Sequence, residues 1–391
     1  MRILLANFSK MVHDTGGVAK VSCAFANEMR RRGHTVEIVY VDEREGKTFF
    51  PLDFGITAIN LQHYKGTAIH FPLWMKVKRE LLRPLNIRRA RMVNDDFITK
   101  KLLGRVRMVL DAFQPNVIVT FQPAANKIFL LDLHLHIPLI SMSHGDPEDY
   151  FHTYPPAEVR ALPLCTVCQV LLPSFKNPLQ SRYPQMRVEV IGNAVPEYEV
   201  AADLFAERKP RRVLFIGRLV KNHKRPHLVI EAFAHLAADF PDWILELWGA
   251  EDRKNYLQEL RDLIAKNHLE TRIHIKGTTN DVASVLFEGD LFVMPSAYEG
   301  FPLALTEAMS MGLPAIGYRH APAVNELIQD GKTGLLVGDG VKPLEEAMRA
   351  LMASKELRAR MGKAAREAMK TYAPEVIWDK WDALLKEIAR G

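Results

Sequence analysis

The feature that most constrains the fold is a repeated alternation of short apolar runs with longer amphipathic stretches. The chain opens with RILLANF, then a loop containing two glycines, then the helix-like VSCAFANEMRRRGH and a second apolar run, TVEIVYV. A strand, loop, helix and strand in this order favour a right-handed β-α-β unit and hence a parallel sheet. The pattern continues through NVIVTF, PLISMSH, CQVLLPS and RVEVIGN. The first half is therefore predicted to be α/β.

A second series of the same kind follows a change in composition. The segment from Glu197, EYEVAADLFAERKPRR, is polar and lacks helical or strand periodicity, so we interpret it as a linker. Apolar runs then resume as RVLFIGRL, WILELWG, RIHIKG, LFVMPS and LPAIGY. A chain of 391 residues is long for one core. We therefore predict two doubly wound parallel-sheet domains, 1–196 and 205–372, with an amphipathic helix over 375–391.

Composition narrows the class of protein. Hydrophobic residues make up 48% of the chain and charged residues 25%, as in soluble globular proteins. The apolar run at the N-terminus is too short for a signal peptide, and no run suggests a membrane span, so we expect a cytoplasmic location. Of the three cysteines, Cys165 and Cys168 form a C-x-x-C inside an apolar run. A buried core pair is the favoured interpretation, and a redox role is the alternative.

The net charge of +6 is concentrated in one segment, 74–107, which contains many lysines and arginines but only three acidic residues. Its interleaved apolar residues suit an anionic membrane surface, which would make the protein peripheral at the inner face of the membrane. A solvated helix pair is the alternative. Nucleic acid is disfavoured as a partner because no recognised binding motif accompanies the charge.

Two cations follow the first strand of the second series. Arg218 comes directly after VLFIG, and Lys224 follows a short polar loop. Ligands of doubly wound sheets bind at the carboxyl ends of the strands. A guanidinium and an ammonium at one such edge suit a pyrophosphate, although a solvated surface loop would have the same composition.

The segment LFVMPSAYEGFPLALTEAMSMGLPAIG carries a more specific pattern. A buried strand, a turn over 299–302 and a helix over 303–311 are expected in succession. The backbone amides of residues 301–305 and the helix dipole would form an anion site. Glu299 and Glu307 are eight positions apart, so one carboxylate can reach a sugar hydroxyl while the other accepts from a ribose diol. Alternatively, Glu299 caps the helix and Glu307 faces solvent.

These residues resemble the retaining glycosyltransferase family four, whose E-x7-E motif is matched by Glu299 and Glu307. The resemblance covers nearly the whole chain and is strongest over 213–336, with GRL, EAF, WGA, IKG and NELIQDGKTGLLV among the similar segments. It implies the GT-B architecture, in which two Rossmann-like domains face each other. It also implies that the final helix packs on the N-terminal domain and that the domains close about hinges near 195–210 and 372.

The resemblance implies a donor site made of residues in both halves. Arg218 and Lys224 would hold the donor diphosphate, with Lys221 as a competing candidate because Lys224 is followed by Arg225 where similar sequences have glycine. Glu299 would bind the hexose and Glu307 the ribose. The remaining donor-binding positions are the glycine loop Gly16 and Gly17, the base-side pair Gly277 and Thr278, and Gly300, Phe301, Pro302, Leu303, Leu305 and Thr306 around the sugar and phosphate.

Two features of the first half bear on the same site. Gly16 and Gly17 permit close backbone approach to a ligand, but no G-x-G-x-x-G is present, so a dinucleotide cofactor is not expected; a tight turn is the alternative. His144 follows the strand LISMS, and the resemblance places it by the donor sugar, although a lone histidine there is often structural.

No D-x-D motif follows a strand, so no metal and no cofactor are expected. Cationic side chains and helix N-termini would supply the positive charge that magnesium supplies in other sugar transferases. The resemblance implies retention through front-face displacement, in which the leaving phosphate takes the acceptor proton. The expected function is transfer of a hexose from a UDP-sugar to a glycan or lipid-linked acceptor in polysaccharide or lipopolysaccharide synthesis. The alternatives are a GDP-mannose-dependent enzyme, a non-catalytic sugar-nucleotide-binding protein, and an epimerase or phosphorylase of the same architecture.

Overall fold

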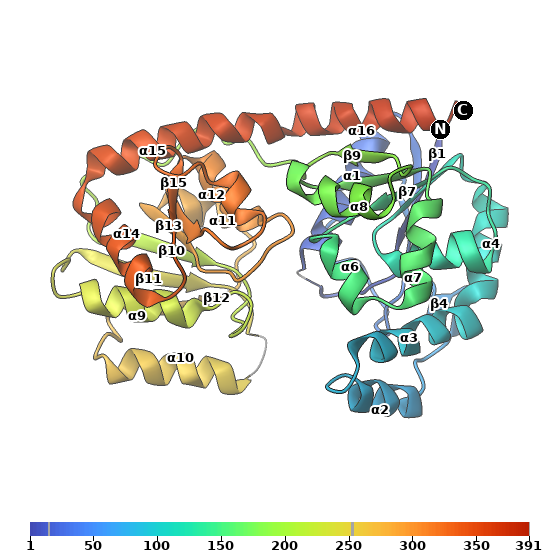
Figure 1. Cartoon of the computed structure of the whole chain (residues 1–391), viewed down its shortest axis with the longest axis horizontal. Helices are drawn as coiled ribbons and strands as arrows, with labels where there is room; N and C mark the ends of the chain where they lie inside the picture. Colours follow the sequence, from blue (N-terminus) through green and yellow to red (C-terminus); the bar gives the residue numbers. More distant parts are fainter. Residues whose placement is uncertain (15, 252–253, 391) are drawn as a thin grey trace. The chain divides into compact units, whose positions relative to one another are not determined.

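The structure is a computed structural model that describes residues 1–14, 16–251 and 254–390, so the last residue of the expected 375–391 segment lies outside the described part. The chain divides into two compact units. Unit 1 contains Met1–Gly192 and Trp378–Gly391, and unit 2 contains Asn193–Ile377. Unit 1 therefore combines the blue-to-green part of the chain with its red end in Figure 1.

Unit 1 is built on a seven-stranded parallel sheet of order β3-β2-β1-β6-β7-β8-β9. Its strands are β1 Arg2–Asn7, β2 Thr35–Tyr40, β3 Thr57–Asn60, β6 Val117–Thr120, β7 Leu139–Met142, β8 Val167–Val170 and β9 Val188–Val190. Its helices are α1 Gly17–Arg31, α2 Leu73–Leu82, α3 Ile87–Phe97, α4 Leu103–Phe113, α5 Pro123–Lys127, α6 Glu148–Thr153, α7 Pro156–Ala161 and α8 Lys176–Arg182. A hairpin of β4 His63–Tyr64 and β5 Thr67–Ala68 precedes α2.

Unit 2 repeats this arrangement with a six-stranded parallel sheet of order β12-β11-β10-β13-β14-β15. Its strands are β10 Arg211–Ile216, β11 Trp243–Trp248, β12 Ile273–Gly277, β13 Leu291–Met294, β14 Ala315–Tyr318 and β15 Gly334–Val337. Its helices are α9 Pro226–Leu236, α10 Lys254–Lys266, α11 Val282–Phe287, α12 Leu303–Met311, α13 Val324–Leu327, α14 Val341–Ala353 and α15 Lys355–Met369; α16 Pro374–Ile388 follows.

The predicted α/β class with two parallel sheets is confirmed, and what sequence reasoning missed lies at the sheet edges. β3 and β15 each form an edge strand of four residues that the apolar-run pattern did not identify. Half of β3 is exposed, and β15 alternates buried with partly buried positions. An edge strand has one unpaired side, so it needs no continuous apolar run.

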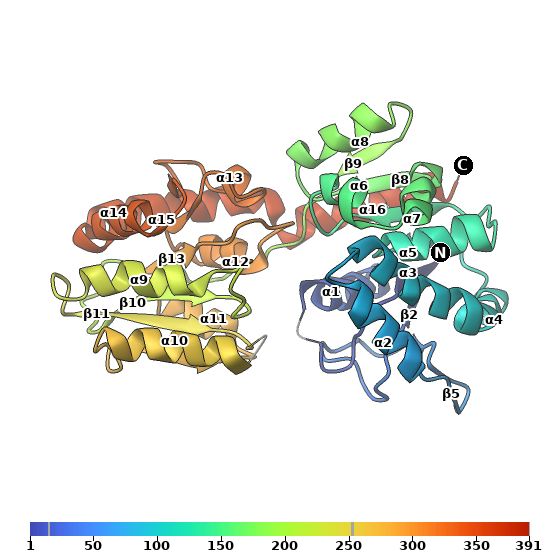
Figure 2. The same ribbon diagram turned by 60° about the horizontal axis from the view of Figure 1, so that its bottom comes forward.

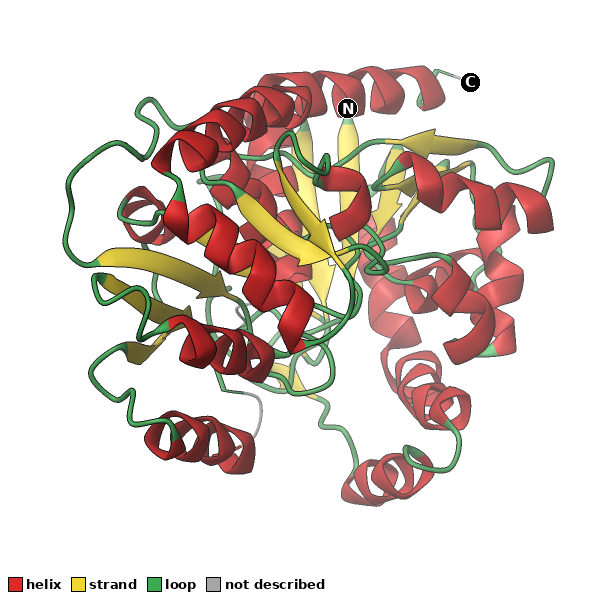
Figure 3. Cartoon of the chain, turned by 60° about the vertical axis from the view of Figure 1, so that its left-hand side comes forward, coloured by secondary structure: helices red, strands yellow, loops and turns green. Residues whose placement is uncertain are grey.

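The core of unit 2 shows why its strands are apolar throughout. Along β10, Val213 and Phe215 pack into a cluster with residues of α9 and α14, and the intervening Leu214 is also fully buried. Helices therefore cover both faces of the sheet, as the red helices around the yellow strands in Figure 3 illustrate. A strand buried on both faces must be apolar at successive positions.

The segment between β9 and β10 contains neither helix nor strand, yet hydrogen bonds and burial hold it against unit 2. The Ala202 amide donates to the Met311 carbonyl at 2.9 Å, and the Ser310 hydroxyl donates to the Pro196 carbonyl at 2.5 Å. Leu204 is buried. These contacts attach the segment to α12, and from Asn193 onward it belongs to unit 2.

Two observations bear on the class of protein. Within the described residues, no helix has the length and apolar character needed to cross a bilayer. The three cysteines are buried free thiols, and burial raises the pKa of Cys23 to about 11.

Candidate functional site

In both sheets the strand order reverses beside the first strand, between β1 and β6 in unit 1 and between β10 and β13 in unit 2. Ligands of doubly wound folds bind outside the strand ends at such a switch point. The loops that follow β10 and β13 carry Arg218, Lys224 and Glu299. The topology of unit 2 therefore brings the expected diphosphate cations beside the first acid of the E-x7-E motif.

Lys224 and Glu299 form the centre of this site. The Lys224 Nζ lies 2.5 Å from the Glu299 Oε1, and the two side chains are only 15% and 8% exposed. His223 lies in the same group, with its ring stacked on Tyr298 at 4.4 Å and its Nε2 2.9 Å from the Tyr298 carbonyl oxygen. The Ala297 amide donates to the His223 carbonyl at 2.8 Å. The two loops are thus fixed to each other by backbone and side-chain contacts.

The two candidate lysines have different ion-pair partners. Lys221 Nζ lies 2.6 Å from the Glu259 carboxylate of α10, in an exposed pair that does not include Glu299. Arg218 is exposed, and its charge is among those that lower the pKa of His223, after the larger effect of burial. The group at the switch point therefore contains Arg218, His223, Lys224 and Glu299.

Arg225 positions the lysine loop, a role that sequence reasoning did not assign. Pro226 follows it and disfavours the helical conformation, and Arg225 adopts a left-handed φ of 50° as the residue before α9. Its Nε donates to the Pro295 carbonyl at 2.8 Å, and its Nη1 lies 2.9 Å from the Asp339 carboxylate. Its guanidinium also lies over the Tyr318 ring. The departure from glycine at this position thus has a structural purpose.

The N-terminus of α12 supplies the expected backbone donors in part. The Thr306 amide already donates to the Pro302 carbonyl at 3.0 Å, and the Thr306 hydroxyl donates to the Leu303 carbonyl at 3.0 Å. Pro302 has no amide hydrogen, so it cannot be one of the donors expected over 301–305. The first-turn amides from Leu303 to Leu305 have no acceptor within the helix and remain available to an anion.

The two glutamates are buried. Glu307 does not face solvent, and Glu299 does not cap the helix, so neither adopts the alternative role considered for it. Glu307 is only 5% exposed inside α12, and its charge, after the larger effect of burial, raises the pKa of Tyr198. Glu299 makes no capping hydrogen bond to α12, which begins after Pro302. The side chain of Phe301 packs on Tyr372 at 5.2 Å, so its backbone is the part available to a ligand, and Gly300 lies in the bend before it.

Glycines line the neighbouring strand ends, and one of them was missed in the sequence. Gly277 has a φ of 76° at the end of β12, followed by the exposed Thr278. Its carbonyl accepts from the Gly249 amide at 2.7 Å. Gly249 has a φ of 150°, and a Cβ there would lie 1.9 Å from the Gly217 carbonyl oxygen. The glycine directly after WILELW was the available signal.

In unit 1 the glycine loop is held by an aspartate that sequence reasoning also missed. Gly16 precedes α1, its amide donates to the Asp14 carboxylate at 2.8 Å, and Gly17 begins the helix. The buried Asp42 Oδ2 accepts from the amides of Met11 and Val12 at 3.0 and 2.9 Å. A carboxylate at the end of the strand after the first helix therefore shapes the loop before that helix.

His144 is neutral and has an unpaired ring nitrogen. Its ring stacks on Phe121 with a centroid distance of 5.4 Å and an interplanar angle of 6°. Burial lowers its pKa to about 4. The Nε2 atom is shielded from solvent and has no hydrogen-bond partner among the described residues. An unpaired buried nitrogen is costly unless a ligand satisfies it.

Comparisons with known proteins identify the family of the chain. A family model described as Glycosyltransferase Family 4 matches residues 15–199, and one described as Glycosyl transferases group 1 matches residues 199–368. The amylovoran biosynthesis glycosyltransferase AmsD of Erwinia amylovora is 30% identical over 255 residues, which are 63% of this chain and 70% of the relative. An exopolysaccharide phosphotransferase of Streptomyces coelicolor is 26% identical over 361 residues, or 90% of this chain. The chain spans only 35% of that relative's length.

Among solved structures, the Anabaena protein HepE in complex with UDP and glucose superposes with a TM-score of 0.71 at 17% identity, covering 98% of this chain and 99% of that one. This likeness shows the fold. Together with the family matches and the parallel sheets of seven and six strands, it confirms the GT-B architecture. The chain belongs to glycosyltransferase family 4, the retaining glycosyltransferases with the GT-B fold.

Proposed function

We propose that the protein transfers a hexose from a UDP-sugar to a glycan or lipid-linked acceptor, with retention, in the synthesis of a cell-surface polysaccharide or lipopolysaccharide. The buried Lys224–Glu299 pair ahead of the N-terminus of α12 is the observation that carries the proposal. The donor class is supported by the Anabaena structure, which was solved with UDP and glucose. The acceptor class is supported by the amylovoran and exopolysaccharide relatives.

The proposed chemistry follows from the charges at the site. Arg218, Lys224 and the first amides of α12 stabilise the diphosphate as negative charge develops on it. Glu299 accepts from hydroxyls of the hexose and Glu307 from the ribose, while His144 lies by the donor sugar. The leaving phosphate takes the acceptor proton, so the protein orients the reactants and needs no base of its own.

The first test is a thermal-shift and hydrolysis screen of UDP, GDP and their common sugars. We expect UDP and one UDP-sugar to raise the Tm of the wild type, and Glu307→Ala and Arg218→Ala to lose that shift. A thermal shift with GDP and GDP-mannose alone would mean that the donor is GDP-mannose and not a UDP-sugar. Binding without hydrolysis or transfer under any condition would indicate a sugar-nucleotide-binding protein.

The proposal includes no essential metal, because the cations at the switch point supply the positive charge. Within the described part of the chain, no three His, Cys, Asp or Glu side chains gather as a metal site. Dialysis against EDTA should therefore leave donor hydrolysis unchanged. Loss of activity that magnesium restores would contradict this part of the proposal.

An anionic membrane surface is the second partner that we propose, and α2 carries it. Leu73, Val77 and Leu81 recur every four residues along α2 and are exposed, Leu81 to 67%; Leu85, in the turn after the helix, is exposed to 82%. Trp74 is exposed beside them. Cations from the same segment surround this apolar stripe, so charge and burial act together at an anionic surface.

Vesicle sedimentation tests this partner. We expect binding to vesicles containing phosphatidylglycerol, weaker binding to phosphatidylcholine alone, and loss of binding in a Trp74→Ser/Leu81→Ser variant. The matched control is Met108→Ser, which changes an exposed apolar residue on α4. Equal sedimentation of the double variant and the wild type would reject α2 as the docking element.

A further inference from the structure

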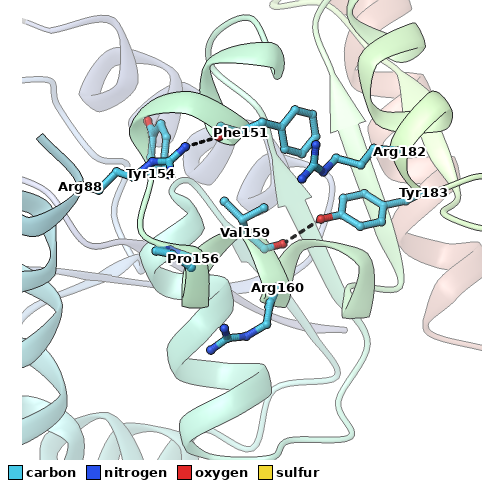
Figure 4. A pocket seen from close by; sticks show the side chains of 8 residues that line it. All are labelled: Arg88, Phe151, Tyr154, Pro156, Val159, Arg160, Arg182 and Tyr183. Atoms are coloured by element: carbon cyan, nitrogen blue, oxygen red, sulfur yellow. Dashed lines mark hydrogen bonds between the residues drawn. The ribbon is translucent and has the colours of Figure 1, made fainter.

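Unit 1 contains a pocket that no expected donor residue lines. Figure 4 shows three arginines around it, from three different helices: Arg88 on α3, Arg160 on α7 and Arg182 on α8. Its remaining walls are Phe151, Tyr154, Pro156, Val159 and Tyr183. We name these eight residues the arginine pocket. Its volume is about 250 Å³.

The positive charge of the arginine pocket is not neutralised by the protein. Within the described residues, none of Arg88, Arg160 and Arg182 has a carboxylate oxygen within 4.0 Å. Elsewhere in unit 1, Arg32 and Arg187 are paired with Asp379 and Glu387. Three arginines therefore line this small cavity without a carboxylate partner, and the positive charge that they leave there favours an anionic ligand.

The walls of the pocket are held in place. The Arg88 Nε donates to the His152 carbonyl at 2.8 Å, and its Nη2 donates to the Phe151 carbonyl. The Arg182 guanidinium lies over the Phe151 ring at 4.5 Å, and the Tyr183 hydroxyl reaches the Val159 carbonyl at 3.5 Å, as drawn in Figure 4. The cavity is therefore formed before any ligand arrives.

The aromatic walls and the volume limit what can bind. Aromatic rings present flat apolar faces to a sugar ring or an isoprenoid chain, and the arginine forks suit the paired oxygens of a phosphate or carboxylate. The volume lies below the roughly 300–1,000 Å³ of pockets that enclose a whole drug-sized ligand. One charged group with part of its neighbour fits this space, and a complete nucleotide-sugar does not.

We propose that the arginine pocket binds an anionic group of the acceptor, a phosphate or a carboxylate, so that the acceptor is a diphosphate-linked lipid or an acidic glycan. This inference rests on the proposed transferase function and defines its acceptor. The pocket is formed in unit 1 by α3, the connection between β7 and β8, and the end of α8, whereas Lys224 and Glu299 lie in unit 2. Donor binding and acceptor binding can therefore be tested separately.

The test compares wild type with Arg160→Gln/Arg182→Gln, in which both altered side chains are exposed and lack carboxylate partners. The control is Arg107→Gln, which removes an exposed arginine of α4 in the same unit. Isothermal titration is run on the full chain with UDP in saturating amounts, so that the diphosphate cations are occupied. The probes are a short-chain polyprenyl diphosphate and glucuronic acid.

We expect one probe to bind wild type and Arg107→Gln equally and the double variant about tenfold more weakly or worse, because hydrogen bonds to charged groups are lost. Binding of the diphosphate supports a lipid-linked acceptor, and binding of glucuronate supports an acidic glycan. No binding of either probe to wild type, or equal binding to the double variant, overturns the inference. The UDP thermal shift should be intact in both variants; its absence from wild type would instead count against the proposed function.

Discussion

Lys221 and Lys224 lie three positions apart in one loop, yet their surroundings differ. Lys224 contacts Glu299 in a largely buried pair, and Lys221 contacts Glu259 in an exposed one. Exposed pairs contribute little to stability, whereas a buried ammonium next to the proposed donor site acts in a medium of low polarity. The two lysines therefore form a matched pair for mutagenesis.

We predict that Lys224→Ala lowers kcat/KM for donor hydrolysis by about 10²-fold or more, since a charge aimed at the developing anion is removed. Lys221→Ala should stay within about twofold of wild type, because a surface ion pair contributes little. Steady-state kinetics with the donor found in the ligand screen will show the difference. Equal losses in the two variants would assign the diphosphate role to neither lysine alone.

A buried pair of carboxyl groups, Glu158 on α7 and Asp95 on α3, gives unit 1 a distinctive pH dependence. Burial, followed by the charge of Asp95, raises the pKa of the Glu158 carboxyl to about 9. Burial also raises the pKa of Asp95. In the unfolded chain Glu158 returns to its ordinary pKa of 4.5. Between these values the folded state keeps a proton that the unfolded state releases.

Raising the pH from 5 to 9 should therefore lower the free energy of unfolding, by at most about 1.4 kcal/mol per pH unit from this group. Glu158→Gln retains a donor for Asp95 but cannot ionise. Its stability relative to wild type should thus increase steadily across this window. Urea denaturation at pH 5, 7 and 9 measures the effect, and parallel pH profiles for the two proteins would show that Glu158 is not held protonated.

At the scale of elements, the ends of β10, β11 and β12 are joined by close backbone contacts. The Gly249 amide binds the Gly277 carbonyl, and the Gly249 Cα approaches the Gly217 carbonyl so closely that no side chain fits between them. These strand ends carry the loops with Arg218 and Thr278. Strand register in unit 2 therefore determines where the loops proposed to bind the donor begin.

We predict that Gly249→Ala destabilises the protein by about 3 kcal/mol and abolishes the UDP thermal shift, because a Cβ would overlap a main-chain oxygen at an unfavourable φ. Gly331→Ala is the control, since Gly331 also has a positive φ, 74°, but open space around it. It should cost about 1 kcal/mol and leave the shift intact. Equal unfolding midpoints for the two variants would refute the steric argument.

At the scale of the whole molecule, unit 1 is made of two stretches that are far apart in the sequence, 1–192 and 378–391. The last turns of α16, drawn in red in Figure 2, belong to unit 1. There Trp381 packs edge-on against Phe25 at 4.9 Å, and Trp378 does so at 5.8 Å. His34 Nε2 lies 2.9 Å from the Asp382 carboxylate. Unit 1 thus needs residues from beyond unit 2 to complete its core.

Trp381→Ala should lower the free energy of unfolding of unit 1 by about 3–5 kcal/mol, as expected for a buried aromatic side chain. Lys380→Ala, at the exposed neighbouring position, should change it by less than about 0.5 kcal/mol. Chemical denaturation of the full chain tests both. A Trp381→Ala variant as stable as wild type would mean that unit 1 folds without α16.

The sequence by itself determined the alternation of strands and helices and the two parallel sheets, and it predicted candidate site residues at the strand ends. These follow from periodicity and glycine placement within short windows, where backbone preferences act between near neighbours. Glu299 and Glu307 were predicted as site residues from their spacing and the resemblance to the E-x7-E motif, and Arg218 from its place directly after a strand. The edge strands β3 and β15 were not predicted, because strands that are only partly covered lack a continuous apolar run.

Only the tertiary structure decided which side chains meet. It paired Lys224 with Glu299, placed Asp42 under the glycine loop, and gathered three arginines from three helices around one pocket. Each of these groupings joins residues that are about 20 or more positions apart in the sequence and lie on different secondary-structure elements or loops. Their proximity depends on strand order and helix packing, because the sheet brings distant loops to one edge regardless of their separation in the sequence.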